Sequence, residues 1–223
     1  TIEGNMRREM LQVLNEAAPS LFLLDLQPDQ AEPFRALATA HPGVNRVETV
    51  PMLRGRIAVV KNVDADNAPA APGGEWALRG ERGITWSATP PLHSTLVAGE
   101  WWPQDYRGPA LVSLDAEVAE GLGLTLGDRI GVNVLGRVIE GRISSLRRIE
   151  WGTLAINFVL IFSPGVLENA PQTHLATVYA DTKVEAELER AIVERFPNVS
   201  TIRVKDALDT VNKIVADIGL AVR

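Results

Sequence analysis

Cysteine is absent from the 223-residue sequence. The chain therefore forms no disulfide, offers no thiolate nucleophile and cannot hold zinc through sulfur. Histidine is scarce as well, because His41, His93 and His174 lie far apart and no His-Glu-x-x-His or similar ligand spacing occurs. We expect no metal site and no bound cofactor.

Long apolar runs are also missing. The longest, residues 158 to 162, has the length of a strand, whereas a membrane-spanning helix needs about 20 apolar residues. The sequence opens at Thr1 without an initiator methionine, and no signal-peptide pattern follows. We expect a soluble segment of a longer protein.

An excess of positive charge is the third absence. The formal net charge is −6, and the basic residues are scattered, with short doublets at Arg7-Arg8 and Arg147-Arg148. A nucleic-acid-binding role is therefore disfavoured. With 46% hydrophobic and 22% charged residues, the chain has the composition of one large or two small globular domains.

Catalytic and nucleotide-binding motifs are not found either. Gly131 and Gly136 have the glycine spacing of a phosphate loop, but the lysine and the hydroxyl are missing and the pair spans a predicted hairpin. No Gly-x-Ser-x-Gly elbow is present, and the adjacent His93 and Ser94 would point to opposite sides of an extended chain. We expect no catalytic residue, and no enzymatic activity of the chain itself.

The clearest local pattern that is present runs from Leu111 to Arg148. A strand leads to Asp115, whose side chain can cap a short helix, and Gly121 and Gly123 supply its left-handed exit. A turn at Gly127-Asp128 follows, and then a strand with Ile130, Val132 and Val134 on one face. A hairpin turn at Gly136-Arg137 leads into a return strand from Val138 to Leu146.

Two β-α-β patterns flank this stretch. The first has strands at residues 21–26 and 44–60 around a helix from Pro28-Asp29 to Ala40, and the second has strands at 154–162, 173–180 and 199–204 with a helical turn after Ser163 and a helix at 184–196. Joined, they predict an α+β fold, in which a split ferredoxin-like sandwich carries residues 61–153 as an insertion. Residues 61–75 are too polar and small to build a core face, so we place a surface loop and a domain boundary there.

Helical patterns occur at both ends. Residues 3–17 predict either an amphipathic helix on its own domain or a stalk continuing from an upstream segment. From Val204 to Val222 apolar residues recur at spacings of three and four residues, which predicts a helix with an apolar seam. We assign this helix to a C-terminal stalk whose seam is formed by Leu208, Val211, Val215 and Ile218. The expected division is 1–18 for the first stalk, 19–62 with 154–204 for the split domain, 63–153 for the inserted domain and 205–223 for the second stalk.

Residues 76–110 hold four of the five tryptophans, Trp76, Trp86, Trp101 and Trp102. Neighbouring residues on a strand point to opposite faces, so at least one of Trp101 and Trp102 should lie near the surface or against another domain. Core packing and a contact surface for a partner or apolar ligand both remain open for these rings. We take the four as candidate contact residues.

Taken together, these segments resemble the extracytoplasmic domain found between the first two membrane helices of MacB/FtsX-like ABC-transporter permeases. The likeness is greatest to permeases encoded beside an ATPase and a lysophospholipase-type esterase. The strings that carry it are LFLLDLQPDQ at 21–30, VETVPMLRGRI at 47–57, LVAGEWW at 96–102, GLGLTLGDRIGVNVLG at 121–136, SSLRRIEW at 144–151, NFVLIFSPGVLENAP at 157–171 and FPNVSTIRV at 196–204.

The resemblance implies a split porter domain, an inserted mainly-β sabre domain and helical stalks that lead to membrane spans. It implies a periplasmic location at the outer face of the bacterial cytoplasmic membrane, a cytoplasmic ATPase subunit that drives motion of this domain, and a dimer in the full transporter. Lipids or other hydrophobic molecules would be the substrates, and a periplasmic esterase or lipid-handling protein a further partner. Two alternatives remain, a secreted protein that binds a peptide or sugar, and a hydrolase that uses Ser94.

Overall fold

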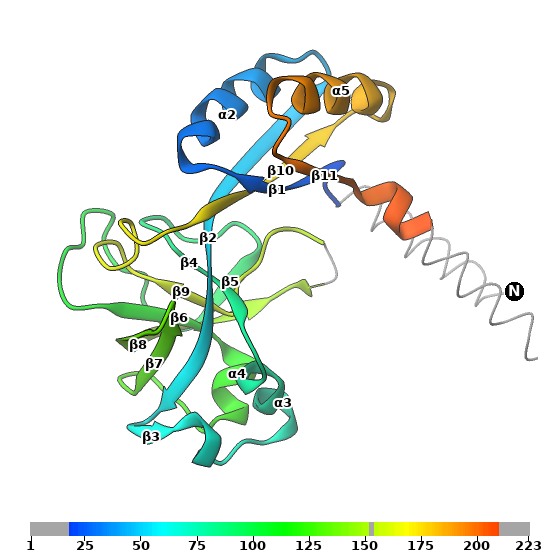
Figure 1. The fold of residues 1–223 in the computed structure, drawn as a ribbon. Coiled ribbons are helices and arrows are strands. Elements are labelled where there is room, and N and C mark those ends of the chain that lie inside the picture. The colour runs from blue at the N-terminus through cyan, green and yellow to red at the C-terminus, as the bar shows by residue number, and fades with distance from the viewer. Residues whose placement is uncertain (1–17, 152–153, 210–223) are drawn as a thin grey trace, which may run out of the picture. The chain divides into compact units, whose positions relative to one another are not determined.

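The computed structural model describes residues 18–151 and 154–209. The fold is α+β, mostly sheet with few helices, as the sequence predicts (Figure 1). The strands are β1 (Leu21–Leu26), β2 (Val44–Val60), β3 (Val63–Asp64), β4 (Arg82–Trp86), β5 (Ser94–Gly99), β6 (Leu111–Asp115), β7 (Arg129–Val134), β8 (Arg137–Ile149), β9 (Leu160–Phe162), β10 (Thr173–Ala180) and β11 (Ser200–Arg203). The helices are η1 (Pro28–Gln30), α2 (Ala31–Ala40), η2 (Ala65–Asn67), α3 (Pro72–Glu75), η3 (Trp76–Leu78), α4 (Ala116–Gly121), η5 (Thr182–Val184) and α5 (Glu185–Arg195).

The chain divides into two compact units. Unit 1 contains residues up to 50, 151–156 and those from 173 onward, and unit 2 contains residues 51–150 and 157–172. The division expected from the sequence gives residues 51–62 and 157–172 to the split domain, whereas their contacts place them in unit 2. The reason is packing, because Leu53 and Ile57 of β2 are buried in the core of unit 2.

Unit 1 has the strand order β11-β1-β10-β2. Strand β1 pairs antiparallel with both β10 and β11, and α2 and α5 cover one face of the sheet (Figure 1). This is the ferredoxin-like arrangement that the two β-α-β patterns predict. Alternation along β1 buries Leu21 and Leu23 beneath the helices, where Phe34 and Phe196 meet edge to face with ring centroids 6.2 Å apart.

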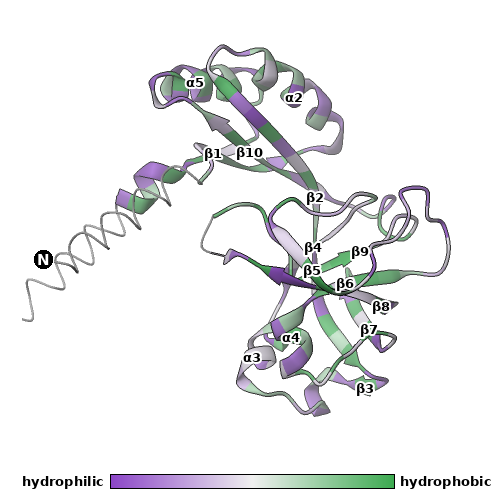
Figure 2. Ribbon diagram, turned by 180° about the vertical axis from the view of Figure 1, so that it is seen from behind, coloured by the Kyte–Doolittle hydropathy of each residue, from purple (hydrophilic) through white to green (hydrophobic). Residues whose placement is uncertain are grey.

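Unit 2 is built from the strand order β2-β4-β9-β6-β8-β5, with β3 and β7 paired to β2 and β7 also to β8. Strand β6 runs parallel to β8 and antiparallel to β9. Figure 2 shows apolar segments along β6, β7 and β9, where alternate side chains enter the core. Polar segments colour parts of α2 and α5 in unit 1, as expected for helices with one face in water.

The Leu111 to Arg148 pattern folds nearly as predicted. Asp115 caps α4, since its Oδ1 accepts the Glu117 amide over 3.0 Å, and Gly123 leaves the helix at φ 66°. Gly121, however, is not left-handed. A Cβ there would lie 2.2 Å from the backbone nitrogen of Gly74, so glycine is required by the close approach of α3 and α4.

Three other segments differ from the sequence expectation. Residues 154–162 pair as a strand only at Leu160–Phe162, and turns in place of a helical turn follow Ser163. Residues 61–75, expected to be a loop, form β3, η2 and α3, with Ala65 and Gly74 buried. Small residues build these elements because they allow close backbone packing, not because they provide a large apolar face.

The predicted stalks fall mostly outside the described residues. The pattern at 3–17 and the seam residues Val211, Val215 and Ile218 lie there, while residues 204–209 are helical and contain Leu208. Within residues 18–151 and 154–209, no helix combines the length and the hydropathy required to cross a membrane.

Candidate functional site

Trp101 and Trp102 are stacked in the segment that follows β5. Their ring centroids are 4.1 Å apart, and the indole N–H groups donate to the carbonyls of Ala88 and Ser87 over 3.0 and 2.8 Å. The expectation that the pair lies on one strand with rings on opposite faces is wrong, because the segment is not a strand and the rings lie together. Trp102 is buried at 4% exposure, whereas Trp101 is half-buried.

The other two candidate tryptophans are also anchored within unit 2. Trp86 donates to the Gln172 side chain over 2.9 Å, and Trp76 donates to the Gly73 carbonyl over 2.9 Å. The Arg82 guanidinium lies 4.4 Å from the Trp76 ring centre, within cation–π range. All four indole N–H groups therefore have partners inside the protein, and any further contact would use ring surface.

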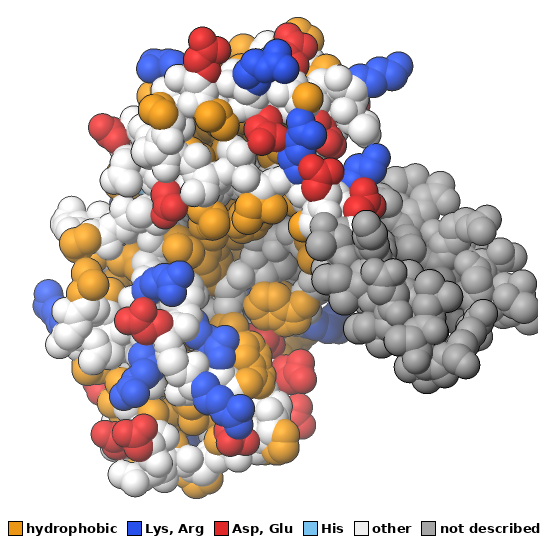
Figure 3. All heavy atoms as spheres, turned by 45° about the vertical axis from the view of Figure 1, so that its right-hand side comes forward, with side chains coloured by type: hydrophobic (Ala, Val, Ile, Leu, Met, Phe, Trp, Pro, Cys, Tyr) orange, Lys and Arg blue, Asp and Glu red, His pale blue; other side chains and the backbone are white. Residues whose placement is uncertain are grey.

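Strand β5 and the loop before it carry exposed apolar side chains that were not among the candidate contact residues. Leu92 is 70% exposed, Val97 48% and Leu96 37%. Strand β5 ends the strand order of unit 2, and its residues Ser94–Gly99 contain neither charge nor proline, the usual protections of a free edge. We call Leu92, Leu96, Val97 and Trp101 the edge surface. Figure 3 shows apolar patches on unit 2 with Lys and Arg side chains between them.

A buried arginine underlies this edge. Arg147 of β8 is 1% exposed and donates to the hydroxyls of Ser94 in β5 and Ser113 in β6, over 3.2 and 2.9 Å. It also donates to the carbonyls of Phe158 and Val159, over 2.8 and 3.3 Å. Burial lowers the pKa of Arg147 to about 10, partly offset by the charge of Asp115. Arg147 thus fixes β5 to the core with a positive charge that neutral oxygens solvate.

The sequence contained a signal for this arginine. The Arg147-Arg148 doublet counts among the scattered basic residues of the sequence, but the alternation Ile143, Ser145, Arg147 places the first of the two on the inward face of β8. The burial pattern confirms that assignment, because all three are buried and Arg148 is exposed.

Unit 1 contains a cavity of about 620 Å³ with mixed polar and apolar walls, next to the helix at residues 204–209. Burial raises the pKa of Glu185 and of Tyr179, two of the groups that line it. Among the predicted stalk residues, Leu208 also lines it. Its other walls include Ser20, Lys183 and Lys205.

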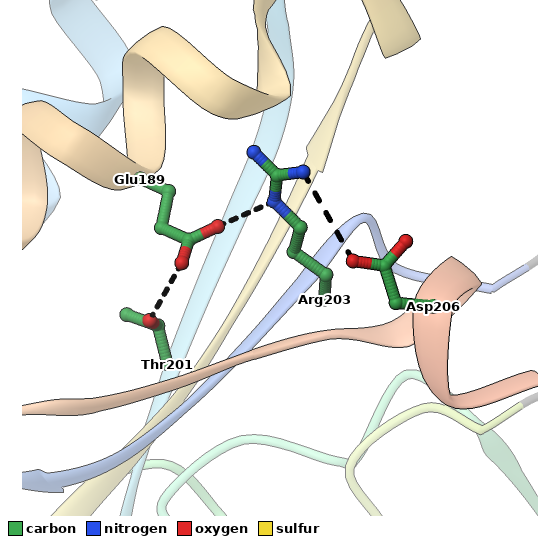
Figure 4. Close-up of polar contacts among 4 residues, drawn as sticks. All are labelled: Glu189, Thr201, Arg203 and Asp206. Atoms are coloured by element: carbon green, nitrogen blue, oxygen red, sulfur yellow. Dashed lines mark hydrogen bonds and ion pairs between the residues drawn. The ribbon is translucent and has the colours of Figure 1, made fainter. Parts of the chain in front are cut away.

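Charged contacts join that helix to α5. Figure 4 shows Arg203, at the end of β11, donating to Glu189 of α5 over 2.5 Å and lying 4.0 Å from Asp206. Thr201 donates to the same Glu189 carboxylate over 3.3 Å. The segment leading into the C-terminal helix is therefore held to α5 by side chains as well as to β1 by backbone pairing.

Unit 2 has a second cavity, of about 640 Å³ and largely apolar, formed by the β2–β3 turn and α4. Val60, Val63, Pro69 and Leu122 contribute to its walls, and Lys61 reaches Asp128 over 3.5 Å. Among residues 18–151 and 154–209, no group of three or more His, Asp or Glu side chains is arranged to hold a metal ion.

Comparison with known proteins identifies a related sequence. The chain is 28% identical over 176 residues to the uncharacterized ABC transporter permease YbbP of Escherichia coli K12, and the match covers 79% of this chain and 21% of that protein. The chain is thus homologous to about a fifth of a permease. No family model matches.

Among solved structures, the comparison finds the crystal structure of a domain assigned to a permease of Porphyromonas gingivalis. The TM-score is 0.47 and the sequence identity 11%, with 85% of this chain and 91% of that domain covered.

Proposed function

We propose that the chain is the extracytoplasmic domain of an ABC-transporter permease of the MacB/FtsX-like type. The homology to a segment of YbbP carries this proposal, because a segment without a membrane-crossing helix in its described part fits a domain outside the bilayer. The full protein would be anchored in the bacterial cytoplasmic membrane, with this domain on the periplasmic side. A cytoplasmic ATPase would act through the membrane helices, and the domain itself would catalyse no reaction.

In this proposal unit 2, the sabre-like domain, contacts the substrate or a partner. The edge surface supports this contact role. It offers apolar area on and beside strand β5, which carries neither charge nor proline, through Leu92, Leu96, Val97 and the half-buried Trp101. Trp76, Trp86 and Trp102 are the other candidate contact residues of the proposal, and their indole N–H groups are hydrogen-bonded within unit 2. Lipids or other hydrophobic molecules, and a periplasmic esterase as partner, are the occupants proposed.

Unit 1, the porter-like domain, would receive motion through the stalks. The Arg203–Glu189 contact supports this role, because it joins the beginning of the C-terminal helix to α5. Leu208, with Val211, Val215 and Ile218, would form the stalk seam. Pairing of two such domains in a dimeric transporter belongs to the same proposal.

One experiment tests the permease assignment and a second tests the edge surface. The gene should encode apolar segments of roughly 20 residues on both sides of this chain. Their absence would refute the permease assignment whatever the edge surface does.

For the edge surface, the full-length transporter is reconstituted with its ATPase, and release of a fluorescent long-chain acyl ester from the membrane is measured together with ATP hydrolysis. Leu96→Thr with Val97→Thr keeps β-propensity while removing apolar area, so ester release should fall and basal ATP hydrolysis should persist. Val193→Thr, at a similarly exposed position of α5, is the control and should change neither. Unchanged ester release in the β5 variant would remove the edge surface from the proposal.

A further inference from the structure

The turn between β7 and β8 has an apolar residue at its tip, although a leucine there is unfavourable both for its backbone conformation and for its exposure to water. Leu135 and Gly136 both have positive φ, 52° and 85°, which is a type I′ turn that favours Asn-Gly and disfavours leucine. Leu135 is 73% exposed, the highest value for any large apolar side chain in the described part of the chain. Neither burial nor backbone preference explains a leucine here.

The hairpin that carries Leu135 is well ordered by its contacts. Asn133 Oδ1 accepts the Gly136 amide over 3.0 Å, and β7 and β8 pair without interruption from Arg129 to Arg142. Val138, 47% exposed, follows the tip and lies against Gly131, where a Cβ would come within 3.2 Å of it. The backbone of the hairpin is therefore hydrogen-bonded up to its tip, where Leu135 and Val138 expose apolar side chains.

Three arginines lie on the strands at and beside the tip. Arg137 directly follows the turn, Arg56 of β2 lies opposite Asn133 in the sheet register, and Arg54 shares the outward face of β2 with Arg56. All three are exposed, and no ion pair to them is found within residues 18–151 and 154–209. The nearest acid along β8, Glu140, lies 3.9 Å from Arg129 instead. In a chain of net charge −6, this tip is locally cationic.

We propose that the Leu135 hairpin tip docks onto an anionic phospholipid surface. Its arginines would lie at the level of the lipid phosphates, and Leu135 with Val138 would reach below them. A protein partner fits less well, because a stable protein interface buries about 800 Å² on each side and a convex two-residue turn offers far less. The proposal is independent of the permease assignment, since it concerns surface chemistry of this chain alone.

The test is co-sedimentation of the 223-residue chain with extruded vesicles, either of phosphatidylcholine alone or of phosphatidylcholine mixed with phosphatidylglycerol. We expect binding to the anionic vesicles at low salt, weaker binding at high salt and little binding to phosphatidylcholine alone. Leu135→Asn should weaken partition about tenfold, and Arg56→Gln with Arg137→Gln by a similar factor.

Leu135→Asn also controls for folding, because asparagine favours the left-handed conformation and should leave the melting temperature equal or higher. Val193→Asn is the matched control, since Val193 is 42% exposed but lies on α5 in unit 1, and it should bind anionic vesicles as the parent does. Equal binding of Leu135→Asn and parent, equal loss in Val193→Asn, or no binding of the parent to anionic vesicles at low salt would each overturn the proposal.

Discussion

The Nε of Arg147 donates to the hydroxyl oxygen of Ser113 over 2.9 Å, and the Ser145 hydroxyl donates to that same oxygen over 2.7 Å. A buried guanidinium is thus solvated by serine oxygens and main-chain carbonyls, and no carboxylate of residues 18–151 and 154–209 forms an ion pair with it. Buried charge is costly unless its hydrogen bonds are complete, so this network determines whether the core around β5, β6 and β8 is stable.

Replacing Arg147 by methionine should lower the free energy of unfolding by about 3 kcal/mol. Methionine fills much of the volume, but the carbonyls of Phe158 and Val159 and the hydroxyl of Ser113 lose their donor. Arg147→Lys should be destabilising as well, because an ammonium cannot reach partners on three segments at once. Urea unfolding followed by tryptophan fluorescence measures both. A methionine variant as stable as the parent would show that the network gives no net stabilisation.

Asp115 is a second buried ionisable residue, and its role as a helix cap can be tested separately from its charge. Its Oδ1 accepts the Glu117 amide at the start of α4, and burial raises its pKa. Asp115→Ala should destabilise the protein by about 1 kcal/mol through loss of the cap, whereas Asp115→Asn keeps an acceptor without a desolvated carboxylate and should lose less. Thermal unfolding at neutral pH compares the two. A larger loss for asparagine than for alanine would contradict the capping explanation.

Local sequence patterns predicted the elements whose formation depends on nearby residues. The bounds of β1 and β10 match the expected 21–26 and 173–180, and the cap at Asp115 was identified from residue type and position alone. Where contacts between residues distant in sequence determine the structure, the local patterns predicted it incorrectly. Residues 158 and 159 belong to an apolar run that resembles a strand, yet their carbonyls bond Arg147, and only residues 160–162 pair as β9.

The candidate site shows the same limit. The tryptophans stood out by type, and the structure brings Trp101 and Trp102 together, but their contact role is still a prediction. Leu96 and Val97 could not be selected from sequence, because whether β5 lies at an edge depends on which strands pair with β8. The division within β2 was missed for a related reason, since a strand of 17 residues gives no local sign of where one core ends and another begins.

The contact between α3 and α4 predicts a strong difference between two neighbouring glycines. A Cβ at Gly121 would lie 2.2 Å from the Gly74 nitrogen, so Gly121→Ala should cost about 3 kcal/mol by forcing the two backbones apart. Gly123 has open space around it and φ 66°, and asparagine tolerates that conformation. Gly123→Asn should therefore cost about 1 kcal/mol or less. The urea midpoints of the two variants measure this difference in stability. Equal losses of stability would mean that α3 and α4 can move apart at little cost.

His174 at the start of β10 predicts how stability depends on pH. Its Nδ1 is buried and has no hydrogen-bond partner among the described residues, and burial lowers its pKa from 6.5. The folded state thus takes up a proton less readily than the unfolded chain. The contribution of the neutral ring is fully present above pH 6.5 and is lost as the pH falls through the lower pKa of the folded state.

A His174→Gln variant, which cannot take up this proton, should therefore lose less stability than the parent as the pH falls below 6.5. Urea unfolding of both proteins across that range measures the difference, and taking the difference removes the contribution of carboxylates that titrate in both. The variant could be less stable than the parent at neutral pH through imperfect packing, but that offset does not depend on pH. Parallel stability curves for the two proteins would show that His174 is not a source of acid sensitivity.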